Sequence, residues 1–165
     1  MEKNLQSKEA REKFRKLVND IKVCMFITNN PESDHTRPMF TVEVEDDDSL
    51  WFFSDKRSLK VEEIEDDKRV HLVYAHPGKE SYLDVWGTAT INTDKKNIKD
   101  KWSPMMKAWF HDGVDDPNIC LLKVKPQNLY YWDAENGKMV SILKMVVAAV
   151  TGKNVGEDAE GKLSV

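Results

Sequence analysis

Seven short β-type segments, mostly joined by hairpin-length turns, follow one another along the chain, and no strand–helix unit repeats. The pattern is clearest over Thr36–Val44, where Phe40, Val42 and Val44 fall at every second position and so share one face of a strand. Further segments of this kind are Val23–Thr28, Leu50–Ser54, Val70–Ala75, Tyr82–Ile91, Asn118–Val124 and Gln127–Asp133, the last two interrupted by Pro126. The sequence therefore predicts a mainly β fold, a small antiparallel barrel with peripheral helices, rather than a doubly wound parallel sheet.

Helical segments are expected before the first strand and at intervals between the others. In Ser7–Asp20, the apolar residues Phe14, Leu17 and Val18 lie three and four positions apart, with Ser7 as the expected N-cap. The remaining expected helices are Lys60–Asp67, a segment capped by Thr93 or Asp94, and a short one with Pro104 in its first turn. A last strand or helix is expected over Met139–Leu143.

At 165 residues, the chain is expected to hold a single domain over residues 1–151, with a flexible polar tail over 152–165. The formal net charge of −4 argues against a general nucleic-acid binder. The longest apolar run, Val140–Val150, falls short of the roughly 20 residues that span a bilayer. The charged N-terminal segment lacks an apolar signal-peptide core, so a cytoplasmic location is expected, with Cys24 and Cys120 as buried, reduced thiols.

Chemistry is concentrated in the stretch after the strand LWFF, which reads SDKRSLKVEEIEDD. Ser58 occupies an expected helix N-cap, and Lys60 lies in the first turn, where the positive end of the helix dipole does not favour a cation. Free backbone N–H groups, a hydroxyl and an ammonium together suit an anion. The alternative is structural: Ser58 caps the helix, and Lys60 pairs with Glu62 or Glu63.

A second cation, Arg37, precedes Pro38, which forces it into an extended conformation. A guanidinium on a strand beside LWFFS could bind phosphate oxygens in a forked arrangement. A surface ion pair is the alternative for this residue as well. Taken together, Arg37 and Lys60 favour a phosphate site without naming its ligand.

These linked motifs resemble the flavin-binding core of the pyridoxamine 5′-phosphate oxidase superfamily, in its general stress protein branch. The core consists of an Arg-bearing strand, a tight turn and a strand that continues as aromatic-aromatic-Ser-x-x-x-Ser-x-Lys. Segments that match run from about residue 23 to residue 150 and read TRPMFTVEV, LWFFSDKRSLKVEEI, RVHLVYAHPGKESYLDVWGTATI, WSPMMKAWFHDGVDDPNICLLKV and YYWD.

The resemblance implies a split β-barrel that forms a homodimer, with flavin mononucleotide (FMN) in a groove between the subunits. The residues that would contact the phosphate and ribityl chain are Arg37, Ser54, Ser58 and Lys60. Those that would line the isoalloxazine ring are Pro38, Met39 and Phe53. Leu59 stands where the pyridoxamine oxidases carry a second basic residue, which implies a lighter hold on the phosphate. The C-terminal segment with which those oxidases hold pyridoxal phosphate is absent, so that activity is not expected.

Aromatic residues fall into two groups. Trp51, Trp86 and Trp132 lie in strands and are expected in the core or barrel wall. Trp102, Trp109 and Phe110 lie in a helical insertion, where core packing and contact with a flavin ring are both open. The four histidines and two cysteines show no metal-ligand spacing, so no metal is expected. His111 and the acidic loop Asp112–Asp116 have no assigned role.

Three functions are compatible with these features. The first is a flavin-dependent oxidoreductase of unknown substrate, electron donor and acceptor, with no catalytic residue that can be named. The second is a non-catalytic flavin-binding or flavin-storing stress protein. The third is a split barrel that binds another ligand, such as haem or a deazaflavin.

Overall fold

The computed structural model describes residues 2–30, 32 and 34–132. Within this range the chain folds into one antiparallel sheet of seven strands, in the order β2-β1-β5-β6-β7-β4-β3. The strands are β1 (Val23–Thr28), β2 (His35–Phe40), β3 (Glu43–Val44), β4 (Leu50–Asp55), β5 (Arg69–His76), β6 (Ser81–Asn92) and β7 (Ile119–Trp132). The sheet curls into a split β-barrel, as predicted. The segments expected over 139–143 and 152–165 lie outside the described residues.

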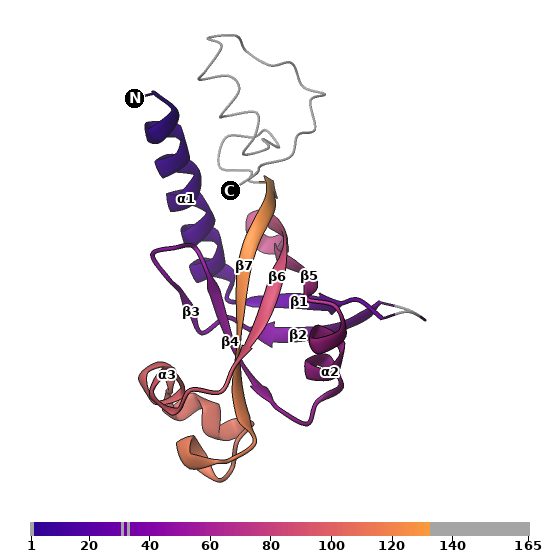
Figure 1. Ribbon diagram of the computed structural model, residues 1–165. Helices are drawn as coiled ribbons and strands as arrows, with labels where there is room; N and C mark the ends of the chain where they lie inside the picture. The colour runs from indigo at the N-terminus through magenta and orange to yellow at the C-terminus, as the bar shows by residue number, and fades with distance from the viewer. Residues whose placement is uncertain (1, 31, 33, 133–165) are drawn as a thin grey trace.

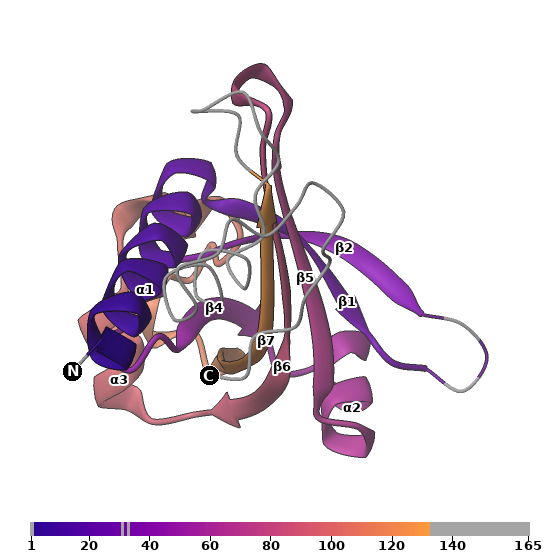
Figure 2. The ribbon, with the colours of Figure 1, turned by 90° about the horizontal axis from the view of Figure 1, so that it is seen from above.

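Helices pack around the barrel (Figures 1 and 2). They are α1 (Glu2–Ile21), α2 (Leu59–Asp66) and α3 (Lys95–Lys101), with three 3₁₀ turns, η1 (Pro77–Lys79), η2 (Pro104–Ala108) and η3 (Gly113–Asp115). Helix α1 lies beside one half of the long strands β6 and β7, while α2 and α3 lie on opposite sides of the other half. Among the described residues, no helix combines the length and the apolar character that crossing a membrane requires.

Two expected helix starts can be compared with the structure. Helix α1 begins at Glu2, so Ser7 lies inside it and the expected N-cap at Ser7 is wrong. The cap of α3 is Asp94, whose side chain accepts a hydrogen bond from the backbone N–H of Asn97 at 2.9 Å. Capping by Asp94 fixes the direction in which the chain leaves β6.

The strand expected over Thr36–Val44 is divided in two. Its first part, β2, pairs with β1, whereas its second part, β3, pairs with β4. Between them, the Thr41 N–H donates to the Lys22 carbonyl and the Val42 N–H to the Trp51 carbonyl, both at 2.8 Å. The chain thus changes neighbours at this corner, which an alternating pattern does not reveal.

The interruption expected at Pro126 does not occur, because β7 runs through it. Pro126 lies opposite Gly87, where the β6–β7 register shifts. A bulge leaves a residue outside the regular ladder, so the missing N–H of proline is tolerated there. Gly87 is required at this contact, since a Cβ would lie 2.3 Å from the Lys125 carbonyl oxygen.

The core has two parts. The larger one fills the barrel beneath α1, and the smaller one joins β4 and β7 to α3 and η2 through Trp51, Phe53, Ile98, Met106, Phe110, Ile119 and Leu121. This smaller core holds the insertion between β6 and β7 against the barrel.

Both cysteines are buried and free, as predicted. Trp86 lies in the barrel wall, on β6, but its side chain is 47% exposed and so is outside the core.

Candidate functional site

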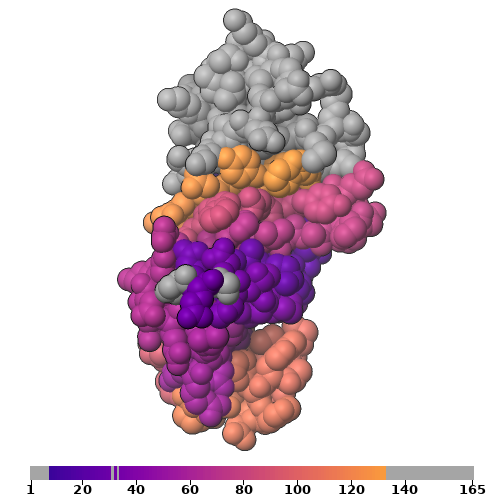
Figure 3. Space-filling model, turned by 90° about the vertical axis from the view of Figure 1, so that its right-hand side faces the viewer, coloured from indigo at the N-terminus to yellow at the C-terminus, as the bar shows by residue number. Residues whose placement is uncertain are grey.

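A cavity of about 380 Å³ lies where the barrel is split. One wall comes from β2, which ends the sheet on one side, and the other from β4, which lies near the opposite end of the strand order. Helix α2 and the turn η2 complete the lining. Figure 3 shows the segment that follows α3 standing beside the α2 region, with a hollow where the two meet.

The polar end of this cavity is organised by Lys60. Its Nζ donates to Ser54 Oγ at 2.7 Å and to Ser58 Oγ at 3.4 Å. The two hydroxyl oxygens lie 3.3 Å apart. Burial, and then the nearby charge of Arg37, lower the pKa of Lys60. An ammonium and two hydroxyls therefore converge on one point, from the end of β4 and the start of α2.

Ser58 has the backbone position of an N-cap, as expected, but its side chain makes no capping hydrogen bond. Its hydroxyl is instead directed to Ser54 and Lys60. The alternative in which Lys60 pairs with Glu63 is also not found, since the Glu63 carboxylate binds other donors. Ser58 thus supports Lys60 from behind, and the Lys60 ammonium is left to the cavity.

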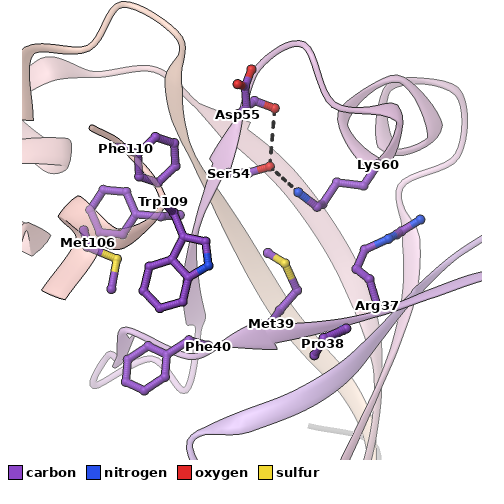
Figure 4. A pocket seen from close by; sticks show the side chains of 11 residues that line it. Arg37, Pro38, Met39, Phe40, Ser54, Asp55, Lys60, Met106, Trp109 and Phe110 are labelled. Atoms are coloured by element: carbon purple, nitrogen blue, oxygen red, sulfur yellow. Dashed lines mark hydrogen bonds between the residues drawn. The ribbon is translucent and has the colours of Figure 1, made fainter. Parts of the chain in front are cut away.

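Arg37 lines the same end but is partly engaged in an ion pair. Its Nη2 lies 3.2 Å from Glu63 Oε2, and its Nη1 donates to Thr28 Oγ1 at 2.7 Å. The Glu63 side chain is only 5% exposed, so the partner of Arg37 is a buried carboxylate rather than a surface one. In Figure 4 the Lys60 ammonium points toward Ser54, whereas the Arg37 guanidinium turns away from it.

The opposite end of the cavity is apolar. It is lined by Phe40, Phe53, Met106, Trp109 and Phe110. In Figure 4, Phe40, Met106 and Phe110 lie on the same side of the cavity as the Trp109 indole, whereas Lys60 lies on the other side. Trp109 is 61% exposed, although most tryptophan side chains are largely buried, so it covers the cavity rather than filling the core.

Most of the residues predicted to bind the cofactor line this cavity, namely Arg37, Pro38, Met39, Phe53, Ser54, Lys60, Trp109 and Phe110. Ser58 and Trp102 stand behind the lining. Ser58 contacts Lys60, and Trp102 packs edge-on against Phe53 with ring centroids 5.7 Å apart. Trp102 is therefore a support for the ring-lining aromatic. Whether these residues bind a cofactor stays a prediction of the sequence.

Several lining residues had not been predicted. Phe40, Asp55 and Met106 were missed because the motif marks the strand and the turn, not the side chains that the fold brings beside them. The Arg57 guanidinium, which donates to Asp55 Oδ2 at 2.7 Å, lowers the pKa of that carboxyl to about 2. Asp55 is therefore an ionised residue at the edge of the polar end.

Other reactive side chains lie outside the lining. Cys120 is buried next to Ser54 in the β4–β7 pairing, and burial raises its pKa to about 11. His111 is exposed and is not one of the cavity residues. Over the described part of the chain, no three His, Cys, Asp or Glu side chains are grouped so as to hold a metal ion.

The split barrel with a two-ended cavity at its open edge defines the class of protein to which this chain belongs. The model of the family described as pyridoxamine 5′-phosphate oxidase like matches residues 9–156, so the chain is a member of that family, as its motifs suggested. Among curated proteins, it is 28% identical over 142 residues to General stress protein 26 of Bacillus subtilis (strain 168), which covers 84% of this chain and 99% of the relative.

Solved structures agree with this assignment. General Stress Protein 26 from Bacillus anthracis str. Sterne is 26% identical, with a TM-score of 0.66 over 73% of this chain and 92% of that one. The general stress FMN/FAD binding protein from Xanthomonas citri is 27% identical, with a TM-score of 0.68 over 81% and 94% of the two chains. The chain is thus similar to general stress proteins in sequence and in fold.

Proposed function

We propose that this protein binds FMN in the cavity at the split of the barrel and acts as a flavin-dependent oxidoreductase. The observation that carries the proposal is the division of the cavity into an apolar, aromatic end and a polar end with the Lys60 ammonium and the Ser54 hydroxyl, behind which Ser58 contacts Lys60. FMN has the same division, with a flat aromatic ring joined by a polyol chain to a phosphate. The FMN/FAD binding of the relative from Xanthomonas citri supports this choice.

The residues at the polar end would hold the phosphate. Lys60 supplies the charge, Ser54 and Ser58 supply hydroxyl donors, and Arg37 adds a guanidinium at the edge. Charge-assisted hydrogen bonds of this kind are about twice as strong as neutral ones. An FMN phosphate is a terminal dianion, and the partly buried Lys60 ammonium supplies an opposite charge at this end of the site.

The residues at the apolar end would hold the isoalloxazine ring. Pro38, Met39 and Phe53 would line it, Trp109 and Phe110 would cover it, and Trp102 would support Phe53. Offset or edge-on aromatic contacts contribute about 1 kcal/mol beyond burial of area. When bound, the flavin supplies the redox chemistry, and the protein positions it and excludes water.

Storage of the flavin without turnover is the second candidate. It is favoured by the composition of the ring end, where the described lining residues Phe40, Phe53, Met106, Trp109 and Phe110 offer no acid or base to a substrate. Anaerobic mixing of the flavin-loaded protein with reduced nicotinamide cofactors separates the two candidates. Bleaching of the flavin absorbance supports an oxidoreductase, and an unchanged spectrum supports a carrier.

Flavin binding itself is tested with the full chain and two ligands, FMN and riboflavin, which differ only in the phosphate. Lys60→Met is expected to weaken FMN binding by about 2 kcal/mol, because a hydrogen bond to a charged group is lost. Riboflavin binding should stay unchanged. Lys56→Met is the matched control, since Lys56 donates to the Pro117 carbonyl and does not line the cavity. Wild-type protein that takes up neither ligand would overturn the proposed function.

We further propose that the protein is a homodimer, with residues 1–151 as one flavin-binding domain. The support is an apolar patch on the outer face of the sheet, where alternate residues of neighbouring strands are exposed together. Its members are Val23 and Met25 of β1, Ala75 of β5 and Trp86 of β6. Patches of this kind mark sites of association.

The free, buried thiols of Cys24 and Cys120 support a cytoplasmic location for this function.

A further inference from the structure

Glu63 is a buried carboxylate that faces the back of the candidate phosphate site. Its side chain is 5% exposed and lies on the inner face of α2. Asn30 Nδ2 donates to its Oε1 at 3.0 Å, and the ring of His35 contacts the same oxygen. The hydroxyl of Thr28 and the Nη2 of Arg37 both donate to its Oε2. Four partners from β1, β2 and the turn between them thus hold this carboxylate in place.

Glu63 is ionised wherever the protein is folded at ordinary pH. Burial by itself would raise the pKa of the Glu63 carboxyl, but the hydrogen bonds that it accepts outweigh burial and bring its pKa to about 2. Its charge is therefore constant at neutral pH.

The charge of Arg37 is directed to this carboxylate and not to the centre of the cavity. Arg37 binds Glu63 directly, and it also binds Thr28, whose hydroxyl donates in turn to Glu63. Its guanidinium turns away from Ser54 and Lys60 (Figure 4). Lys60 donates to hydroxyls, so its charge stays available at the polar end of the cavity.

We propose that Glu63 sets the affinity of the cavity for phosphate-bearing ligands by holding Arg37 back from them, an inference that rests on the proposed function. A carboxylate within 4 Å of a guanidinium offsets part of its field at distances comparable with their separation, and most of it farther away. The Arg37 charge still lowers the pKa of Lys60, so the ion pair leaves part of that charge at the polar end, beside the full charge of Lys60. Glu63 does not line the cavity, so it acts on the ligand through Arg37 and leaves the ring end unchanged.

The experiment compares Glu63→Gln with the wild type in the binding of FMN and riboflavin to the full chain. Removal of the carboxylate charge frees Arg37, so FMN is expected to bind roughly tenfold more tightly while riboflavin binding stays unchanged. Glu62→Gln is the matched control, since Glu62 lies on the same helix, is exposed and loses the same charge. The control should leave both affinities as they are.

A double-mutant cycle shows whether Glu63 acts through Arg37. In the Arg37→Gln background, Glu63→Gln should no longer tighten FMN binding. A gain that persists in full there would overturn the inference, because the carboxylate would then repel the phosphate directly. Weaker FMN binding by Glu63→Gln would overturn it too, since Glu63 would then be positioning Arg37 on the ligand.

A second variant, which keeps the Glu63 carboxylate, covers the case in which Glu63→Gln fails to fold. Thr28→Ala removes the hydroxyl that bridges Arg37 and Glu63, and it is expected to tighten FMN binding by a smaller factor. No gain in Thr28→Ala, with both variants folded by circular dichroism, would count against the inference. The proposed function fails separately, namely when the wild type binds no flavin. If the wild type binds FMN but Glu63→Gln binds it no more tightly, the inference about Glu63 is wrong and the proposed function still stands.

Discussion

Lys60 shares a confined space with Arg37, Ser54 and Ser58 at the polar end of the cavity. Its ammonium has lost part of its hydration, and the neighbouring guanidinium repels it, so its pKa lies below the usual 10.5. Neither of the hydroxyls that it contacts compensates for a charge as an anion would. The site is therefore electrostatically incomplete on its own, and an arriving phosphate would restore the balance.

A pH dependence follows for ligands that carry a phosphate. A bound phosphate favours the charged form of Lys60, so the pKa of Lys60 is higher in the complex than in the free protein. FMN affinity is then steady at neutral pH and declines as pH rises through the lowered pKa of the free protein, in a range that begins below 10.5. The measurement is a pair of titrations with FMN and riboflavin across this range. Parallel profiles for the two ligands would show that Lys60 does not meet the phosphate.

At this scale the sequence could predict which residues are unusual but not how they pair. A lysine in the first turn of a helix was recognisable from the sequence, and so was an arginine fixed before a proline. The ion pair of Arg37 with Glu63 was not, because it joins α2 to β2 across the fold and leaves no periodic signal. From the sequence, Glu63 was considered only as a possible partner of Lys60.

Helix α1 is fastened to the turn between β3 and β4 by Asp48. This aspartate is buried, with Arg15 Nε donating to its Oδ1 at 2.9 Å and Arg11 Nε lying 3.0 Å from its Oδ2. Its φ of 66° places it in the left-handed region, which Asp and Asn tolerate better than most residues. The helix thereby covers the larger core, with Phe14 buried beneath it.

Asp48→Asn is expected to lower the free energy of unfolding by about 2 kcal/mol, because two arginines lose a buried counter-charge while the backbone conformation is preserved. Urea unfolding followed by circular dichroism measures this change. Asp46→Asn provides the comparison, since Asp46 is fully exposed and lies 3.8 Å from Arg15. It should cost much less, because an exposed ion pair contributes little to stability. Equal losses in the two variants would show that the buried position of Asp48 has no special weight.

Strands were predictable from alternation, but their partners and ends were not. The pattern over residues 36–44 is continuous, yet Thr41 marks a corner where the chain leaves β1 and joins β4. Its side chain hydrogen-bonds the Tyr74 hydroxyl at 2.7 Å, which is a contact set by the tertiary fold. At Pro126 the error was in the other direction. A break in the strand was predicted there, but the strand continues, because Pro126 lies beside a bulge opposite Gly87.

For the molecule as a whole, the outer face of the sheet was the least predictable part. Trp86 does lie in the barrel wall, but its side chain stacks on His71 at the surface, with ring centroids 3.9 Å apart. Val23 and Met25 are exposed on the same face. Composition predicts how many apolar residues a chain has, but not which of them a partner surface will cover.

The homodimer is tested at this face. Met25→Glu places a charge in the apolar patch and is expected to give a monomer, because an unpaired charge is costly at a buried interface. Size-exclusion chromatography with light scattering at micromolar concentration measures the mass, and circular dichroism checks the fold. Thr90→Glu, at another exposed strand position, is the matched control and should remain dimeric. A monomeric wild type would refute the dimer.

The position of Glu63 behind Arg37 also bears on how such proteins can diversify. Codons for Glu and Gln differ in their first base, so one nucleotide change converts the carboxylate to an amide. Because Glu63 stands outside the cavity lining, that change leaves the surroundings of the ring as they are. Under the proposed role of Glu63, descendants of one ancestral barrel would bind the same phosphate-bearing ligand more tightly or more weakly after a single mutation, with the surroundings of the ring unchanged.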